Sequence, residues 1–206
     1  MIWDYDSLWQ KAKQYIDRAY REDRESDLFA FWASLALEFI ARATLARIHP
    51  ALLANPTDAA SFLFAFGYAK TNKPRSIDIT TVYLRCVAIE PDFTEDLSKA
   101  CTTISERRNS ELHSGELAFD GISTAIWLAQ FYKALSALLK NQNKTLADLL
   151  PAEEIGPALE MIEGLEKSYR EQAEKAIGQA KKAFFALTDD QQLAKRQLAQ
   201  QIATAT

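Results

Sequence analysis

Residues that break helices are scarce in this sequence, which has only six glycines and six prolines among 206 residues. A protein of many short strands needs turns at short intervals, and glycine and proline dominate turns. Alanine, leucine, glutamate, lysine and glutamine are plentiful instead, and these residues favour helices. We therefore predict an all-α protein, whose 48% hydrophobic residues suffice for one sizeable core.

Cysteine and histidine are also rare, with two residues of each kind. Cys86 and Cys101 lie in apolar helical patterns and form no CxxC spacing, so we interpret both as small buried side chains in a reducing compartment. One histidine without an aspartate-rich cluster beside it makes a poor metal site. The sequence therefore predicts no bound metal and no cofactor.

An excess of positive charge is missing as well. The net charge is −4 and the isoelectric point about 5.3, so no global field attracts polyanions. This balance argues against extended nonspecific DNA binding, and any contact with a nucleic acid must come from a local patch.

The sequence does not begin with a basic region followed by an apolar run, and we find no uninterrupted apolar span that is long enough to cross a bilayer. We therefore expect no contact with a membrane and a cytoplasmic location.

Apolar residues recur at spacings of three and four, the period of an amphipathic helix. Ser26 and Thr94 are the predicted N-caps of two of these helices, because a hydroxyl there accepts a hydrogen bond from a free backbone N–H. The aromatic residues mostly follow the same period, so we interpret them as packing residues and not as a platform for stacked bases. The predicted helices span residues 4–22, 26–47, 55–68, 76–90, 94–113 and 122–140.

The composition changes after residue 143, and we divide the chain into a helical bundle, 1–143, and a helical extension, 144–206. Gly156-Pro157 suits the start of a long helix, and Thr188 to Gln191 has the pattern of a capping box for a last one. The long helix carries a narrow, alanine-rich stripe that we expect to pack along another helix, either of the bundle or of a second subunit. The stripe consists of Leu159, Ile162, Leu165, Tyr169, Ala173, Ala176, Ala180, Phe184 and Leu187.

Charged residues outside the extension raise further alternatives. Glu38 and Arg42 are four residues apart and most simply form an exposed pair, although Glu38 could instead orient an arginine from another helix. His49 precedes Pro50 and is interpreted as a helix-end histidine. The loop from Lys70 to Arg75 holds three positive charges, which makes it either a solvated connection or a contact for phosphate through Lys73 and Arg75.

The densest polar chemistry lies at residues 105–116. Asn109 and His113 are four apart and lie nearly one above the other on a helix, and Arg108 is long enough to reach the same face. A guanidinium, a carboxamide and an imidazole together suit an RNA phosphodiester. The histidine moves protons near neutral pH, the arginine holds the phosphate, and the 2′-hydroxyl of the RNA is the nucleophile. From spacing alone, a charged helix end with an exposed histidine remains the simpler interpretation.

The segment from Arg108 to His113, Arg-Asn-Ser-Glu-Leu-His, resembles the R-N-x-x-x-H motif of the HEPN superfamily, and Gly115 follows as is usual there. The apolar second helix, with Ala-Leu-Glu-Phe-Ile at residues 36–40, is similar to that of family members. The resemblance covers residues 1 to about 140. It implies an antiparallel helical bundle that dimerises so that both motifs face one cleft.

Many members of that family are metal-independent ribonucleases of toxin–antitoxin, antiviral or RNA-processing systems. The resemblance gives Arg108 the role of phosphate ligand, His113 that of proton-transfer residue and Asn109 that of a positioning group. Arg107 has no assured counterpart and either adds charge to the cleft or is solvated. Glu111 and Glu116 would repel phosphate unless they point away.

Three functions are therefore considered. The first is a homodimeric HEPN-type endoribonuclease that leaves a cyclic phosphate, acting on RNA in bacterial defence or with an antitoxin partner. The second is a non-catalytic HEPN module that binds a nucleotide, RNA or a protein through its C-terminal helices. The third, a purely structural helical protein, leaves the polar stretch unexplained.

Overall fold

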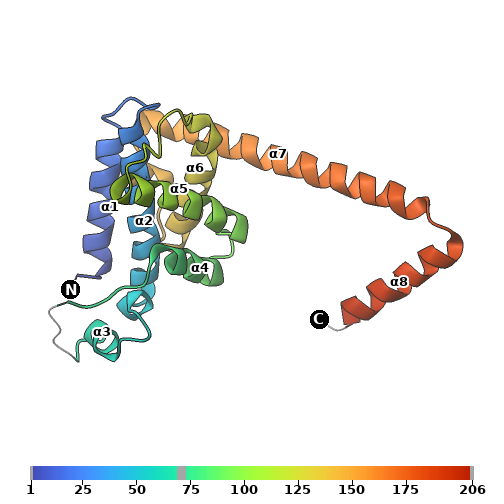
Figure 1. Cartoon of the computed structure of the whole chain (residues 1–206), viewed down its shortest axis with the longest axis horizontal. Coiled ribbons are helices and arrows are strands. Elements are labelled where there is room, and N and C mark those ends of the chain that lie inside the picture. Colours follow the sequence, from blue (N-terminus) through green and yellow to red (C-terminus); the bar gives the residue numbers. More distant parts are fainter. Residues whose placement is uncertain (1, 69–72, 205–206) are drawn as a thin grey trace. The chain divides into compact units, whose positions relative to one another are not determined.

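A computed structural model describes residues 2–68 and 73–204. Within these residues the chain forms eight α-helices and three short 3₁₀ helices, and it has no strand, which confirms the predicted all-α class (Figure 1). The chain divides into two compact units, Met1–Ile162 and Glu163–Thr206. The first unit extends beyond residue 143, because Ala158 is buried in the core and Met161 and Ile162 pack against it.

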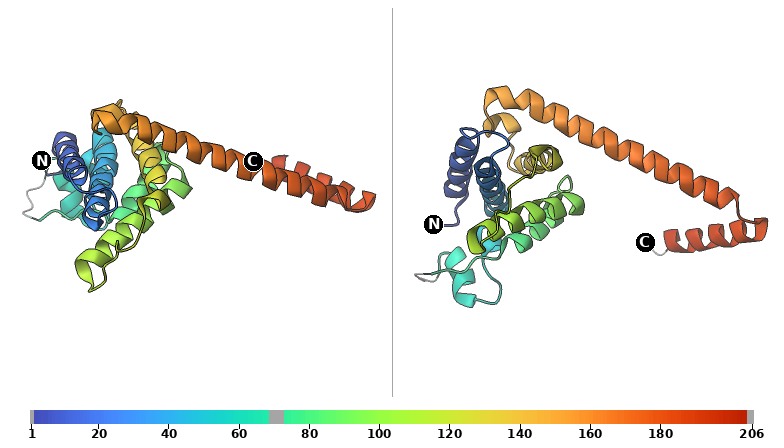
Figure 2. Two further views of the ribbon diagram at one scale, coloured as in Figure 1. Left: turned by 90° about the horizontal axis from the view of Figure 1, so that it is seen from above. Right: turned by 45° about the horizontal axis from the view of Figure 1, so that its top comes forward.

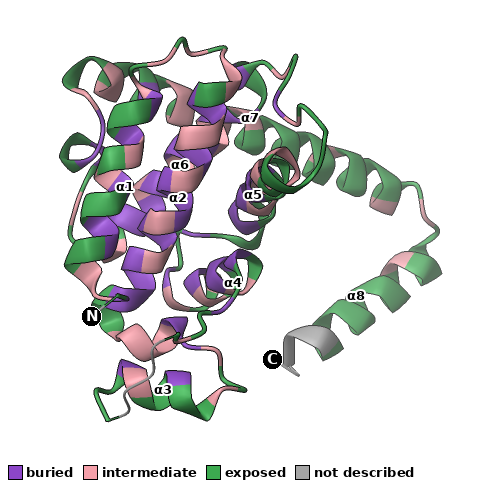
Figure 3. Cartoon of the chain, turned by 60° about the vertical axis from the view of Figure 1, so that its left-hand side comes forward, coloured by how far each residue is buried: buried purple, intermediate pink, exposed green. Residues whose placement is uncertain are grey.

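The first unit is a helical bundle around α2 (Asp27–Ile48). Helix α1 (Tyr5–Ala19) runs antiparallel beside α2, and α4 (Ile79–Ile89), α5 (Glu95–His113) and α6 (Leu128–Asn141) also pack against α2. Buried residues lie on the facing sides of these helices (Figure 3). Helix α1 buries most of the apolar stripe that its spacing predicts. Helix α2 is buried mainly on a different face, and Leu28, which was predicted to face the core, is 52% exposed.

Two of the predicted caps are confirmed. The Ser26 hydroxyl accepts a hydrogen bond of 3.2 Å from the backbone N–H of Phe29 at the start of α2. The Thr94 hydroxyl accepts one of 3.4 Å from Leu97 N–H at the start of α5. These bonds satisfy backbone donors that a helix leaves free in its first turn.

Helix α2 is long and apolar enough, by length and composition, to cross a membrane, which corrects our expectation that no segment is. Two thirds of its most apolar window is buried inside the bundle, 67% by residue. The core helix of a soluble protein has the same character, so the composition of α2 is that of a helix surrounded by other helices.

Four elements begin elsewhere than the sequence predicted. Helix α3 (Ala59–Ala65) and helix α4 are capped by Asp58 and Asp78, which follow the predicted starts. The segment before α6 is a separate turn, η2 (Thr124–Ile126), and Ile126 is exposed, although the spacing of apolar residues in the predicted helix 122–140 puts it on the apolar face of that helix. Two further short turns are η1 (Pro50–Leu53) and η3 (Leu146–Asp148).

Helix α7 (Ala152–Phe185) starts before the predicted Gly156-Pro157. The Glu154 carboxylate holds this first turn, since it accepts hydrogen bonds from Arg24 and, over 3.0 Å, from the Tyr132 hydroxyl. Burial raises the pKa of Tyr132 to about 12, so its hydroxyl stays protonated and able to donate. Pro157 is the sixth residue of α7 and has no N–H to donate to the Glu153 carbonyl, so the helix continues past it with one backbone bond fewer.

The second unit consists of α7 from Glu163 onward and α8 (Asp189–Thr204). Figure 2 shows α7 as one continuous helix. Side chains of this unit are mostly exposed, and none of those described belongs to the buried core. Thr188 N–H donates to Gln191 Oε1 over 3.2 Å, which is one of the two bonds of the predicted capping box.

Candidate functional site

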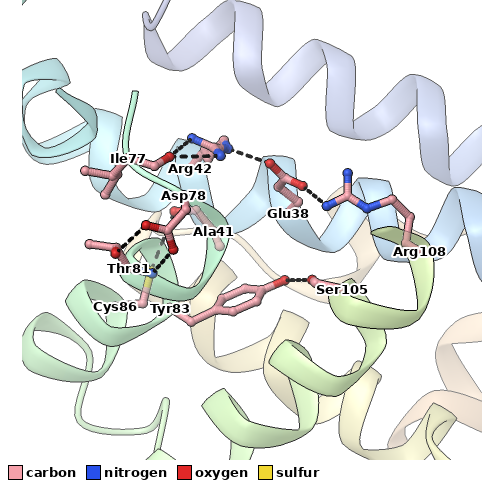
Figure 4. Close-up of polar contacts among 10 residues, drawn as sticks. All are labelled: Glu38, Ala41, Arg42, Ile77, Asp78, Thr81, Tyr83, Cys86, Ser105 and Arg108. Carbon is pink, nitrogen blue, oxygen red and sulfur yellow. Dashed lines mark hydrogen bonds and ion pairs between the residues drawn. The ribbon is translucent and has the colours of Figure 1, made fainter. Parts of the chain in front are cut away.

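Helix α5 carries the predicted motif, and the Arg108 side chain extends from it toward α2 (Figure 4). Its Nη2 donates a hydrogen bond of 2.6 Å to Glu38 Oε2. The two side chains are only 12% and 11% exposed. A charge-assisted bond this short, largely shielded from water, fixes the orientation of the guanidinium.

Glu38 binds a second arginine with its other oxygen. Arg42 Nε donates to Glu38 Oε1 over 2.8 Å, and the terminal nitrogens of Arg42 donate to the Ile77 carbonyl over 3.4 and 3.3 Å. The exposed pair predicted from the spacing is therefore wrong, because α5 packs over this face of α2. The geometry is that of the alternative, in which Glu38 orients an arginine from another helix.

This network contains two guanidinium groups and one carboxylate, so it keeps one positive charge in a poorly solvated place. The Nε of Arg108 is buried and has no hydrogen-bond partner among the described residues. A buried donor without an acceptor is costly, and such a group calls for an explanation in structure or in function.

A second buried contact fixes α5 three residues before Arg108. The Tyr83 hydroxyl and Ser105 Oγ are 3.0 Å apart and join α4 to α5. Burial holds the pKa of Tyr83 well above its ordinary value, so this hydroxyl is neutral. The backbone that carries Arg108 is thus fastened on two sides, to α4 and to α2.

Asn109 and His113 lie at the other face of the same helix end and are exposed. Among the described contacts, no hydrogen bond or ion pair joins either of them to Arg108. Residues five apart on a helix point about 140° away from each other, and Arg108 uses its length to reach Glu38 instead of turning back. A single chain therefore presents the imidazole and carboxamide to solvent and holds the guanidinium against α2.

The residues around the motif order the loop that follows it. Arg107 is exposed, and its Nη1 donates to the Ala118 carbonyl over 3.2 Å. The Glu111 carboxylate accepts from Ala118 N–H over 2.7 Å, so this acid faces the loop. Glu116 is exposed.

Arg107 also lines a largely apolar cavity of about 340 Å³ between α5 and the start of α6. The cavity includes Phe119 of the loop and Trp127 at the start of α6.

Lys73 and Arg75, the candidate phosphate contacts, are exposed in the segment before α4. The backbone of Arg75 is fixed, since its N–H donates to Ser61 Oγ over 2.6 Å and its carbonyl accepts from Asn55 N–H over 3.0 Å. Among the described contacts, none joins Arg75 to the motif. Lys70, which belongs to the same predicted loop, lies outside the described residues.

Two further interpretations concern rings near α3. His49 Nδ1 accepts a hydrogen bond of 3.1 Å from Ala51 N–H, and its ring lies 4.5 Å from that of Phe66, which agrees with the predicted helix-end role. Phe62, Phe66 and Tyr68 are exposed, so the interpretation of aromatic residues as packing groups is wrong for these three. Helix α3 is short and lies at the end of the bundle, where its outer face remains uncovered.

The two cysteines are buried as predicted. Burial raises the pKa of Cys86 to about 12 and that of Cys101 further, so neither thiol is a nucleophile at neutral pH. Among the described residues no cluster of three or more histidine, cysteine or acidic side chains is arranged to hold a metal ion.

The contact that spacing did not reveal is the one between Glu38 and Arg108. The available signal was the presence of Glu38 and Arg42 in the middle of the most apolar long helix of the chain, where charged residues need partners. Comparisons with models of known protein families, with characterised proteins and with solved structures found no significant match to this chain.

Proposed function

We propose that the chain is a metal-independent endoribonuclease of the HEPN type, acting at a cleft that the motifs of two copies form together. The observation that carries this proposal is the arrangement at the end of α5. Glu38 holds the guanidinium of Arg108 in one orientation, while Asn109 and His113 of the same helix end stay exposed. A cation held in one orientation and accessible proton-transfer and positioning groups at the same helix end suit phosphodiester chemistry when two copies bring them together.

In this mechanism the 2′-hydroxyl oxygen of the RNA attacks the adjacent phosphorus, and the bond to the 5′-oxygen breaks. His113 of one copy takes the hydroxyl proton, and the protonated imidazole of the other copy gives a proton to the leaving 5′-oxygen. Arg108 offsets the negative charge that develops on the phosphoryl oxygens. The products are a 2′,3′-cyclic phosphate and a 5′-hydroxyl end.

The geometry of one chain supports a site that two copies form together. Arg108 and His113 point to different sides of α5, so one chain does not surround a phosphate with both groups. A second copy facing the same helix end supplies the missing group. The resemblance adds the rest of the proposal, namely RNA as substrate, a homodimer, a cytoplasmic location and a setting in defence or with an antitoxin.

One observation favours a second candidate, a non-catalytic HEPN module that binds RNA, a nucleotide or a protein. The guanidinium of Arg108 already binds a carboxylate, and Glu38 competes with any phosphate for it. In this alternative the network is structural and the exposed helix end only binds.

The deciding experiment is cleavage of a labelled single-stranded RNA by the purified protein in EDTA. We expect cleavage by the wild type and a loss of at least about 100-fold in His113→Ala, the size of effect usual for general acid–base groups. His49→Ala is the matched control, because it removes the only other histidine and should retain the activity. Equal activity of the His113→Ala and wild-type proteins would contradict the catalytic role. If the wild-type protein binds the RNA without cleaving it, the result would support the non-catalytic binding module.

A further inference from the structure

The segment 163–185 of α7, here called the arm, exposes an apolar face that the described residues do not cover. Tyr169 is 40% exposed, and Ala173, Ala176 and Ala180, which lie within about 40° of it around the helix axis, are exposed as well; Ile177, on the flank of this face, is 54% exposed. Soluble proteins rarely leave a continuous apolar surface in water unless something binds there. We propose that the arm pairs antiparallel with the arm of a second copy of this chain. This inference does not depend on the proposed ribonuclease activity.

The sizes of the side chains favour this partner and this direction. The stripe carries large residues in the first half of the arm, Leu165 and Tyr169, and then small ones, Ala173, Ala176 and Ala180, before Phe184 at its end. An antiparallel pair that crosses between residues 172 and 173 brings Tyr169 level with Ala176 of the other copy, and Leu165 level with Ala180. Large side chains then fill the space above small ones, as close packing requires. A parallel pair would place alanine against alanine and leave gaps.

Charge along the arm points the same way. Its first half, residues 163–174, has four glutamates and two cations, whereas residues 175–185 have three lysines and no acid. An antiparallel pair therefore brings the acidic half of each copy onto the basic half of the other.

One pair of charged residues makes the prediction specific. Glu163 and Lys181 are 18 residues apart, which is five helical turns, so both point to the same flank of the stripe. In the antiparallel register Glu163 of each copy lies level with Lys181 of the other, within one residue. Lys167 points to the far side of the helix, about 150° from the centre of the stripe. It carries the same charge as Lys181 and serves as the control.

The first test measures self-association of the full chain by sedimentation velocity. The variants to compare are Lys181→Glu and Glu163→Lys, because either change brings two pairs of like charges together in each dimer. We expect each variant to associate at least ten-fold more weakly than the wild type. The control variant, Lys167→Glu, should associate within about three-fold of the wild type. An equimolar mixture of the Lys181→Glu and Glu163→Lys chains restores both attractive pairs and should associate like the wild type. Equal effects of Lys181→Glu and Lys167→Glu would overturn the proposal.

The second test reports direction, using a short bis-maleimide and the variants Leu165→Cys and Ala180→Cys. In the antiparallel pair these positions meet only in a mixture of the two variants, so the mixed dimer should dominate there. Each variant cross-linked to itself would show a parallel pair, and no cross-linked dimer would show that the arm covers the bundle or another protein. The wild type gives the background, because Cys86 and Cys101 are buried. Unchanged RNA cleavage by the Lys181→Glu variant would separate this contact from the proposed site.

Discussion

At the scale of single residues, the carboxylate of Glu38 determines where Arg108 points. Burying an ion network stabilises a fold little, because the charges lose their hydration, and apolar side chains of similar size often do as well. Removing one member is different, since it leaves an unbalanced charge where water reaches poorly. The network is therefore best explained by the orientation that it gives to Arg108.

A double-mutant cycle tests whether Glu38 and Arg108 act as one unit. We expect Glu38→Gln to lower the free energy of unfolding by about 3 kcal/mol, because two guanidinium groups lose their counter-charge. Arg108→Met in the same chain removes one of these cations, so the double variant should be about 2 kcal/mol less destabilised than the sum of the single changes. Urea unfolding measures all four proteins.

The control cycle combines Glu38→Gln with Thr94→Ala, a cap at the opposite end of α5, and its effects should add within about 0.5 kcal/mol. Additivity between Glu38 and Arg108 would show that the bond of 2.6 Å contributes nothing to stability. If Glu38 positions Arg108 for catalysis, Glu38→Gln should also reduce kcat for RNA while His113 and Asn109 are unchanged.

The sequence predicted the members of this site better than their contacts. A spacing of four residues places Glu38 and Arg42 on one face of a helix, and the hydrogen bond between them confirms this pairing. Whether the face is covered depends on α5, which follows more than fifty residues later in the sequence, and local periodicity contains no information on such a packing. The same limit explains the arginine that was expected beside His113 and instead reaches α2.

At the scale of helices, hydroxyl caps were predicted well and aspartate caps were not. The caps Ser26 and Thr94 were predicted at the positions where the structure has them. The caps Asp58 and Asp78 were missed, because α3 and α4 were predicted to begin at residues 55 and 76, a few residues earlier. Helix α7 begins earlier than predicted, because Pro157 was interpreted as part of its first turn. The hydrogen bonds that Glu154 accepts from Arg24 and Tyr132 hold the true first turn several residues before that proline. Local aspartate caps therefore set the starts of α3 and α4, and contacts between distant elements set the start of α7.

The cap of α4 leads to a prediction about pH. Asp78 accepts a hydrogen bond of 2.9 Å from Thr81 N–H and another from the Thr81 hydroxyl, and these bonds lower the pKa of its carboxyl below 3.8. A pKa lowered in the folded state means that the stabilisation is present above the unfolded pKa and is lost as pH falls through the folded one. We expect Asp78→Ala to cost about 1 kcal/mol at pH 7 and clearly less at pH 3.

Unfolding in urea at both pH values measures this difference. Glu106→Ala, a change at an exposed position within α5, is the control and should have little effect at either pH. A cost of Asp78→Ala that is the same at pH 3 and pH 7 would show that the carboxylate charge plays no part in the cap.

At the scale of the whole molecule, the buried core belongs to the first compact unit. Every buried core residue described lies between Trp3 and Ala158, and the second unit contributes none. Composition suggested a boundary at residue 143, because the loop there is polar. The buried leucines of and after η3, Leu146, Leu149 and Leu150, follow that loop and belong to the core.

Two shortened chains test where the bundle ends. The chain 1–162 keeps the whole core and the bond of 3.0 Å between the Tyr132 hydroxyl and Glu154, so it should unfold within a few degrees of the full chain. The chain 1–143 loses three buried leucines and leaves Tyr132 without that acceptor. Burial of a leucine contributes about 1.5–3 kcal/mol, so the loss is on the order of 5 kcal/mol, comparable to the whole stability of many domains.

We therefore expect the chain 1–143 to be largely unfolded at 37 °C, as followed by far-UV circular dichroism on heating. The variant Leu149→Ala/Leu150→Ala in the chain 1–162 separates the two causes, because it removes leucine side chains and keeps Glu154. If it is much more stable than the chain 1–143, the anchoring of α7 through Glu154 contributes to the bundle together with the leucines. Equal stability of 1–143 and 1–162 would instead place the end of the folded bundle at the polar loop and make the start of α7 an attachment to its surface.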